Sequence, residues 1–482
     1  MKNNFIRKSI LPILIVFLSV PAFSKIVLPE IFSDHMVLQQ QTEAPIWGKA
    51  TPKKNVRIIT SWDNQTYMVP ADSNGDWTVK LKTPTAGGPY SIAISDGKEL
   101  VLKDILIGEV WICSGQSNME MPLAGWGKVL NYENEITSAD FPNIRLLHIQ
   151  RATSTKLETD IKTVSGGWQV CSPATIPEFS SAGYFFGREL YSKMNIPIGL
   201  ISTNWGGTIA EAWTSSESLQ QMPDFRDSIQ AIKSEDPALQ QISNNPNRVT
   251  VLYNGMINPL VPYAFQGVIW YQGESNADRA YQYRDLFPLM IRDWRKAWNR
   301  DFPFYFVQLA NYMKRDSLPK ESHWAELREA QFRTLHLKNT GMAVTIDIGD
   351  ALDIHPKNKQ DVGKRLAYIA EANTYKLPVI FSGPLYESYT IENGKIRIKF
   401  QHTENGLKTN DGKAPTGFAI AGPDHKFVWA TAVIDGNDVV VSSPDAEFPV
   451  AVRYGWANNP DCNLSNGANL PASPFRTDDF FN

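Results

Sequence analysis

The pattern of hydrophobic and polar residues divides the chain into three parts. In residues 25 to about 107, short segments alternate between apolar and polar residues and are separated by Pro, Gly, Asn and Asp. Alternation with a period of two predicts half-buried strands, and strands at this spacing predict a small β-sandwich. The expected strands cover 44–47, 55–60, 65–69, 76–81 and 90–94, and Ser73-Asn-Gly-Asp76 predicts a hairpin.

From Gly108 the pattern changes to buried apolar runs that alternate with segments of helical periodicity. The apolar runs cover 110–113, 143–149, 197–203, 267–272, 303–309 and 342–348, and the clearest helical patterns cover 186–194, 281–298, 324–337 and 360–372. This alternation predicts a mostly parallel sheet with helices on both faces. A polar, strand-poor segment from about 214 to 250 predicts a helical insertion.

After about Leu377 the strand pattern returns, with expected strands over 395–400, 417–421, 428–433 and 439–441. The predicted organisation is therefore an N-terminal β-sandwich-like domain (25–107), an α/β domain (108–376) and a C-terminal β domain (377–482). A length of 482 residues favours several domains over one.

Residues 1–24 have the features of a cleavable signal peptide. Lys2, Arg7 and Lys8 form a basic start, 10–20 is apolar, and Ala22-Phe-Ser24 is a small-x-small cleavage site. The apolar stretch is too short for a comfortable transmembrane helix. We therefore expect a periplasmic or secreted protein that has no membrane attachment after cleavage.

Composition excludes some functions. The net charge is −3, so the chain lacks the basic surface that binds nucleic acid or anionic lipid. The spacing of Cys113, Cys171 and Cys462 fits no zinc motif. In an oxidising compartment one pair could form a disulfide. Cys113, in an apolar run, is most simply a small buried hydrophobic residue.

The first candidate for chemistry follows the apolar run 110–113. There the chain breaks into Ser114-Gly-Gln-Ser-Asn118, which cannot continue a strand core. A serine at the carboxyl end of a buried parallel strand lies where open α/β sheets place their ligands. The alternative is a surface turn in which a serine caps a helix.

Two further stretches lie at expected strand ends. In 201–208, the paired Gly206 and Gly207 allow a backbone N–H to approach a ligand closely, as an oxyanion donor must. In 268–276, Ser275 is a rival nucleophile, Gln272 offers a side-chain amide to an oxyanion, and Glu274 offers a carboxylate that orients a neighbour. Plain turns are the alternative for both stretches.

The fourth stretch, 347–356, supplies a base. Of seven histidines, His355 alone lies just beyond an expected strand end, with Asp347, Asp350 and Asp353 before it. A serine needs an adjacent imidazole to take its proton, and the imidazole needs a carboxylate to fix its tautomer. The chain contains no Gly-x-Ser-x-Gly, His-Glu-x-x-His, Walker A or Gly-x-Gly-x-x-Gly motif.

These stretches resemble the signature blocks of sialate O-acetylesterases, in the SGNH-hydrolase superfamily of carbohydrate esterases. The matching blocks are Gly115-Gln-Ser-Asn-Met119, Asn204-Trp-Gly-Gly-Thr208, Trp270-Tyr-Gln-Gly-Glu-Ser-Asn276 and Asp353-Ile-His-Pro356, with flanking similarity at 32–40 and 470–478. The resemblance spans nearly the whole chain after the signal peptide. It implies a flavodoxin-like three-layer α/β/α core with added N-terminal and C-terminal β modules.

The resemblance also implies roles for individual residues. Ser117 is the expected nucleophile and His355 the base, and the N–H groups of Ser117 and Gly207 (or Gly206) are the expected oxyanion donors, with Gln272 replacing the usual Asn. The expected substrate-binding residues are Gln116, Asn118, Trp205 and Glu274. Many relatives have Asp-x-x-His, but here Leu352 occupies that Asp position. Asp353 is the expected orienting acid, Asp350 is the second choice, and a Ser-His dyad is the third.

The expected function is removal of O-acetyl groups from sialic acid or a related acetylated glycan, such as acetylated xylan, without a metal or organic cofactor. The expected partner is the acetylated carbohydrate substrate. Two alternatives are a non-catalytic carbohydrate-binding protein on an esterase scaffold and a glycosidase that uses Glu274 and Asp353 as paired carboxylates.

Overall fold

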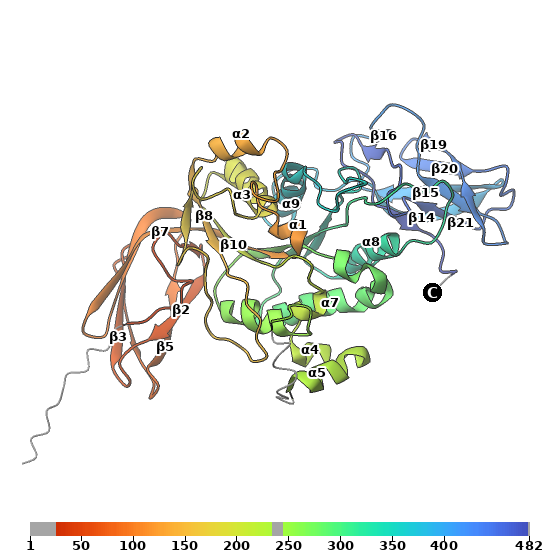
Figure 1. Ribbon diagram of the computed structural model, residues 1–482. Helices are drawn as coiled ribbons and strands as arrows, with labels where there is room; N and C mark the ends of the chain where they lie inside the picture. Colours follow the sequence, from red (N-terminus) through yellow and green to blue (C-terminus); the bar gives the residue numbers. More distant parts are fainter. Residues whose placement is uncertain (1–25, 234–243, 481–482) are drawn as a thin grey trace, which may run out of the picture.

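The computed structural model describes residues 26–233 and 244–480, so the expected signal peptide lies outside the described residues. Figure 1 shows the N-terminal strands at one end of the molecule and the C-terminal strands at the other, with the helices and the central sheet between them. No helix in the described ranges has both the length and the apolar character needed to cross a membrane.

Five parallel strands form the centre of the main sheet, in the spatial order β10-β7-β11-β12-β13. They are β7 (Glu99–Gly115), β10 (Ile198–Asn204), β11 (Gly267–Tyr271), β12 (Phe304–Val307) and β13 (Thr340–Ala343). Numbered along the chain without the outer strand β8, their order is 2-1-3-4-5, the order of flavodoxin-like sheets. β8 (Phe141–His148) pairs in parallel with β10, and β9 (Gln169–Cys171) adds an antiparallel edge.

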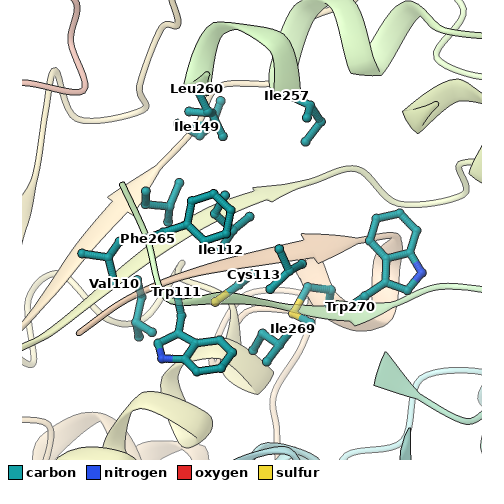
Figure 2. Packing of buried hydrophobic residues seen from close by; sticks show 14 of the residues in the cluster. Val110, Trp111, Ile112, Cys113, Ile149, Ile257, Leu260, Phe265, Ile269 and Trp270 are labelled. Atoms are coloured by element: carbon teal, nitrogen blue, oxygen red, sulfur yellow. The ribbon is translucent and has the colours of Figure 1, made fainter. Parts of the chain in front are cut away.

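The middle of β7 is buried on both faces. Val110, Trp111, Ile112 and Cys113 are each at most 1% exposed. Successive side chains of a strand point to opposite faces, and Figure 2 shows Trp111 and Ile112 on opposite sides of the strand. A strand that is buried on both faces requires an uninterrupted apolar run, so the run 110–113 predicts this strand.

The long helices pack beside this sheet. They are α3 (Ser181–Met194), α7 (Ala280–Ala297), α8 (His323–Arg333) and α9 (Lys359–Asn373). α3 packs against α9 and β10, and α9 also contacts β12 and β13, while α7 packs against α8. Side-chain caps fix three of the starts, because Ser180 accepts from the Gly183 N–H, Ser322 from the Ala325 N–H and Asn358 from the Asp361 N–H.

Short helices and turns connect these elements. They are α1 (Ser117–Glu120), α2 (Tyr132–Thr137), α4 (Ser216–Leu219), α5 (Arg226–Lys233), η1 (Ala210–Trp213), η2 (Pro223–Phe225), η3 (Tyr253–Ile257), η4 (Asn258–Leu260), η5 (Glu274–Arg279) and η6 (Thr334–His336). The described part of the expected insertion contains the helical elements α4, η2 and α5 and then turns over 244–250, and residues 234–243 lie outside the described residues. The strand expected at 342–348 ends earlier than predicted, at Ala343. The chain turns after it, and the Ile348 N–H donates to the carbonyl of Thr345.

The N-terminal region contains β1 (Val37–Gln39), β2 (Glu43–Lys49), β3 (Asn55–Thr60), β4 (Thr66–Pro70), β5 (Asp76–Lys82) and β6 (Gly87–Ser95). β5 pairs with β2, and β4 pairs with β3. The turn at Ser73-Asn-Gly-Asp76 forms, with Gly75 at φ +84°, but it joins strands with different partners, so the expected hairpin is wrong.

β7 belongs to both the N-terminal region and the central sheet. Its first part pairs with β6 and β1, and its last part pairs with β10 and β11. The expected boundary at 107/108 therefore falls inside a strand. One continuous hydrophobic cluster also contains core residues of both regions, from Ile26 to Ala370.

The C-terminal region has a hydrophobic cluster of its own, from Ile396 to Phe475. Its strands are β14 (Leu385–Glu392), β15 (Lys395–Gln401), β16 (Leu407–Thr409), β17 (Phe418–Ala421), β18 (Phe427–Trp429), β19 (Thr431–Asp435), β20 (Asp438–Ser442), β21 (Ala451–Tyr454), β22 (Leu464–Asn466) and β23 (Phe475–Arg476). Fully buried Arg328 of α8 joins this region to the α/β region by donating to the carbonyls of Ala457 and Asn458. Cys113, Cys171 and Cys462 are all free thiols, so no pair among them is bridged.

Candidate active site

Ser117 lies in a tight turn between β7 and α1. Gly115 has φ +143°, and a Cβ there would lie 2.2 Å from the main-chain oxygen of Tyr271 on β11. Only glycine fits such a close approach. The turn places Ser117 at the carboxyl end of β7. The chain continues from β7 to strands on one side of it (β8, β9 and β10) and later to β11 on the other side. Open α/β sheets bind ligands at such a switch point.

Ser117 and the rival Ser275 are both partly exposed, and Ser275 lies within the turn η5. The N–H groups of Ser275 and Gly273 both donate to the side-chain oxygen of Gln116, at 3.2 and 3.3 Å. Gln116 is 2% exposed, so its carbonyl oxygen holds this turn against the Ser117 turn.

His355 lies in the loop between β13 and α9, with a carboxylate at its Nδ1. Asp353 Oδ1 is 3.3 Å from His355 Nδ1 and also accepts the His355 backbone N–H at 2.9 Å. The other oxygen of Asp353 is 3.1 Å from the ammonium of Lys357. A carboxylate at Nδ1 favours the tautomer that leaves Nε2 as the proton acceptor.

The other acidic candidates have different partners. Asp350 accepts the Leu352 N–H at 2.8 Å, which stabilises the loop turn. Asp347 forms a bidentate pair with Arg365, at 2.6 and 2.7 Å. Leu352, at the position where many relatives have Asp, is 93% exposed. Among these three acids, Asp353 is the one at the imidazole.

Asn118 connects the two loops. Its side-chain N–H donates to the carbonyl of Ile354 at 3.0 Å and to Glu274 Oε1 at 2.5 Å. Its side-chain oxygen accepts from the ammonium of Lys359 at 2.8 Å. In the described residues no hydrogen bond joins Ser117 to the His355 ring. Such an absence is common without substrate, because catalytic hydrogen bonds often tighten only when substrate binds.

Lys359 holds the other side of the His355 loop. Its ammonium donates to the carbonyl of Pro356 at 2.8 Å, so the residues before and after His355 are both fixed through Asn118 and Lys359. Lys359 is fully buried, and burial lowers its pKa to about 7, with the carboxylate of Glu274 acting in the opposite direction. Sequence reasoning missed Lys359. Its weak signal is a lysine in the first turn of a predicted helix, where the helix dipole disfavours a cation.

Glu274 is also a buried charged group. The residue as a whole is partly exposed, but its Oε2 is buried and has no hydrogen-bond partner among the described residues. Burial raises the pKa of Glu274, while the hydrogen bond from Asn118 and the charge of Lys359 lower it. With its carboxylate enclosed and bonded to Asn118, Glu274 is not placed as the second carboxylate of a glycosidase.

The pKa of His355 is lowered from its ordinary value. Burial is the largest cause, followed by the positive charge of Lys359, and both outweigh the opposing effect of Asp353. The imidazole is therefore neutral, and able to accept a proton, to a lower pH than a free histidine. This direction is opposite to the upward shift that a carboxylate alone would give.

The two glycines at the end of β10 differ in what they offer. The Gly206 N–H donates to Glu120 Oε2 at 2.9 Å, so it is already used. Gly207 has φ +74°, and a Cβ there would meet nothing within 4 Å. In the described part of the chain, the N–H groups of Ser117 and Gly207 donate to no other residue. These two N–H groups are the ones available to an oxyanion.

Gln272 does not have the expected role of an oxyanion donor. Its two side-chain N–H groups donate to the carbonyl of Thr208 at 3.1 Å and to Asn276 Oδ1 at 2.7 Å. The carbonyl of Thr208 only accepts, so the nitrogen of the amide must face it. The side-chain oxygen of Gln272 accepts from Tyr283 at 2.9 Å. A fully buried amide with all of these bonds is a structural link between strand ends.

The expected substrate-binding residues also need correction. Gln116 and Asn118 are at most 2% exposed, and the Glu274 carboxylate is enclosed, so these three hold the loops together instead of lining an open site. Trp205 is partly exposed, and the guanidinium of Arg151 lies over its ring at 5.6 Å from the centroid. Trp126, which the motifs did not single out, makes an edge contact with the His355 ring, with the ring centroids 5.2 Å apart.

Comparisons with known proteins identify the family of the chain. Residues 107–371 match the family "carbohydrate esterase, sialic acid-specific acetylesterase". The chain is 30% identical to the sialate O-acetylesterases of Mus musculus and Homo sapiens, with 92% of this chain covered in both alignments, and 92% and 91% of those proteins. It superposes on a carbohydrate acetylesterase from Xanthomonas citri with a TM-score of 0.86 and 39% identity, over 94% of this chain and all of that one.

The match to the family covers more than half of the chain and includes the Ser117 turn, the glycine pair and the His355 loop. The chain is therefore an ester hydrolase that belongs to the sialic acid-specific acetylesterase family of carbohydrate esterases.

Proposed function

We propose that this esterase removes O-acetyl groups from an acetylated carbohydrate, sialic acid or a related glycan, through an acetyl-enzyme on Ser117. The observation that carries the proposal is the Asn118 bridge, which holds the Ser117 turn against the His355 loop while Asp353 faces His355 Nδ1. The similarity to proteins named sialate O-acetylesterase and carbohydrate acetylesterase supports the same chemistry.

In this mechanism Ser117 Oγ attacks the acetyl carbonyl carbon and its proton passes to His355 Nε2. The tetrahedral oxyanion receives hydrogen bonds from the Ser117 and Gly207 N–H groups. When the C–O bond to the sugar breaks, His355 returns the proton to the sugar oxygen. Water then attacks the acetyl-enzyme by the same route and releases acetate. Asp353 holds the imidazole tautomer and stabilises the imidazolium.

We further propose that the protein is exported, with its mature chain starting near Lys25, and works in the periplasm or outside the cell. The basic start, the short apolar stretch and the small-x-small site of residues 1–24 support this. The flavodoxin-like strand order and the long helices support a three-layer core to which N-terminal and C-terminal β regions are added. Amino-terminal sequencing of the protein from cell fractions tests the export proposal.

The test of the enzymatic proposal measures acetate and reducing sugar released from the same acetylated oligosaccharide. We expect acetate without new reducing ends, and loss of acetate release in Ser117→Ala. Release of reducing ends would support the glycosidase alternative, and binding of the oligosaccharide without either product would support a non-catalytic binding protein.

A further inference from the structure

A pocket lies directly beside the proposed catalytic residues. Its volume is about 530 Å³, and it is lined by the α1 end, the loop around Trp126, and the segment after β8. One wall contains Glu120, whose Oε2 holds the N–H of Gly206, and a Cβ at Gly206 would be 3.2 Å from the Cβ of Ser117. Another wall contains Trp126, which contacts the His355 ring. A sugar whose acetyl group reaches Ser117 would therefore occupy this pocket.

The lining of the pocket has the chemistry of a carbohydrate site. Trp126 and Val164 line it and are 50% and 63% exposed, so they offer apolar surface to the C–H face of a sugar ring. The carboxylates of Glu120 and Glu178 offer acceptors to sugar hydroxyl groups. Together these side chains provide apolar surface for stacking and acceptors for hydrogen bonding.

The charge of the lining determines which sugar fits. Among the described residues that line the pocket, Arg151 is the one formal cation, and it is already paired, because its Nε and Nη2 lie 2.7 and 2.5 Å from Glu120 Oε1. His148 also lines the pocket, and burial together with the charge of Arg151 lowers its pKa, so it is neutral at pH 7. With Glu178 added, the lining carries one net negative charge.

An acidic sugar would place a carboxylate in this pocket, where the described lining residues offer no cation that is not already paired with a carboxylate. Carboxylate recognition in proteins normally uses an unpaired arginine or lysine. We infer, on the basis of the proposed function, that this pocket binds the sugar that carries the acetyl group and that it takes an electrically neutral sugar in preference to an acidic one such as sialic acid.

The test compares two substrates that differ only in charge: the methyl glycoside of an O-acetylated N-acetylneuraminic acid and its C1 carboxamide. An acetylated xylo-oligosaccharide is the neutral reference. We expect kcat/KM for the acid to be lower than for the carboxamide by about fivefold or more, the factor that one pair of like charges in near contact gives even in water. An equal or higher kcat/KM for the acid would overturn the inference.

Two variants test whether the charge of the pocket causes the difference in kcat/KM between the acid and the carboxamide. Glu178→Gln should raise the ratio of acid to carboxamide turnover, whereas Glu447→Gln, which removes the same charge from an exposed site in the C-terminal region, should leave that ratio unchanged. If Arg151→Met instead reduced turnover of the acid selectively, Arg151 would be a carboxylate receptor, and the inference would be wrong.

Hydrolysis of 4-nitrophenyl acetate separates this inference from the proposed function. If the enzyme cleaves that small ester in a Ser117-dependent way but prefers the acidic sugar, the inference alone fails. If neither the small ester nor any acetylated sugar is cleaved, the proposed function is wrong, and the inference, which rests on it, is wrong as well.

Discussion

The side chain of Asn118 donates a hydrogen bond of 3.0 Å to the main-chain carbonyl of Ile354, 236 residues further along the chain. Asn118 follows the proposed nucleophile directly, and Ile354 directly precedes the proposed base. The bond therefore sets the position of His355 relative to Ser117 without taking part in proton transfer. Such a positioning residue affects the rate by keeping the reacting groups in the productive geometry.

Replacing Asn118 should test this coupling. Asn118→Ala should lower kcat by on the order of two decades with little change in KM, because misplacement of catalytic groups by about an ångström has an effect of that size. Steady-state kinetics on 4-nitrophenyl acetate measure it. Asn134→Ala, at an exposed position on α2, is the matched control. A higher KM with unchanged kcat would show that Asn118 binds substrate instead.

Ser117 and Ser275 lie in similar Gly-x-Ser-Asn sequences but in different surroundings. Ser117→Ala should lower kcat by about four decades or more, as loss of a triad nucleophile does in other enzymes. Ser275→Ala should retain most of the activity, since its N–H only supports the η5 turn. Labelling with an organophosphate followed by peptide mass spectrometry would identify the modified serine, and modification of Ser275 would reverse the assignment.

The pH profile should reflect the lowered pKa of His355. Because the neutral imidazole is the base, kcat/KM should rise with pH, and its midpoint should lie below the ordinary imidazole value of about 6.5. Burial and the charge of Lys359 cause this direction. A midpoint above the ordinary value, or a flat profile from about pH 5 to 8, would contradict it.

Lys359→Met should move the same midpoint upward, because it removes a positive charge that opposes protonation of His355. It should also lower kcat, since the Pro356 carbonyl loses its partner. Lys364→Met, on an exposed position of the same helix, should leave the midpoint in place. A lower kcat without a shift of the midpoint would mean that Lys359 acts only through the structure of the loop.

Asp353 and Asp350 provide a matched comparison within one loop. Asp353→Asn should lower kcat by roughly two or more decades, because an amide at Nδ1 favours the wrong imidazole tautomer. Asp350→Asn should have a much smaller effect, since Asp350 accepts the Leu352 N–H instead. Equal losses in the two variants, measured under the same conditions, would indicate a Ser-His dyad in a sensitive loop.

Gly115 and Gly207 both have positive φ, but only Gly115 is crowded. Gly115→Ala should lower the free energy of unfolding by more than about 3 kcal/mol, because a methyl group would overlap the Tyr271 carbonyl as well as strain the backbone. Gly207→Ala should cost only the backbone strain, ~1–2 kcal/mol. Urea unfolding of the two variants distinguishes these contributions.

Sequence periodicity predicts most of the central strands and long helices, because the buried face of an element determines the spacing of its apolar residues along the chain. The run 110–113 is buried on both faces, and 186–194 and 360–372 lie within α3 and α9. The motifs at the strand ends were also placed correctly in space, because parallel strands bring their carboxyl ends to one edge.

Side-chain roles were harder to predict than side-chain positions. Gln272 follows a strand end, as an oxyanion donor should, but its amide is used by Thr208 and Asn276. Nothing in the local sequence shows which distant carbonyl an amide will meet. The same is true of Lys359, whose burial depends on Asn118 and Tyr271 from other parts of the chain.

The 17-residue strand β7 has a consequence for how this protein can be divided. A cloning boundary or a recombination event at residue 108 would cut through a strand that is paired on both sides of the cut, and not through a linker. The remaining fragment would lose the β1 and β6 partners of that strand and expose part of the shared hydrophobic cluster. The N-terminal region and the central sheet should therefore be expressed together as a single piece.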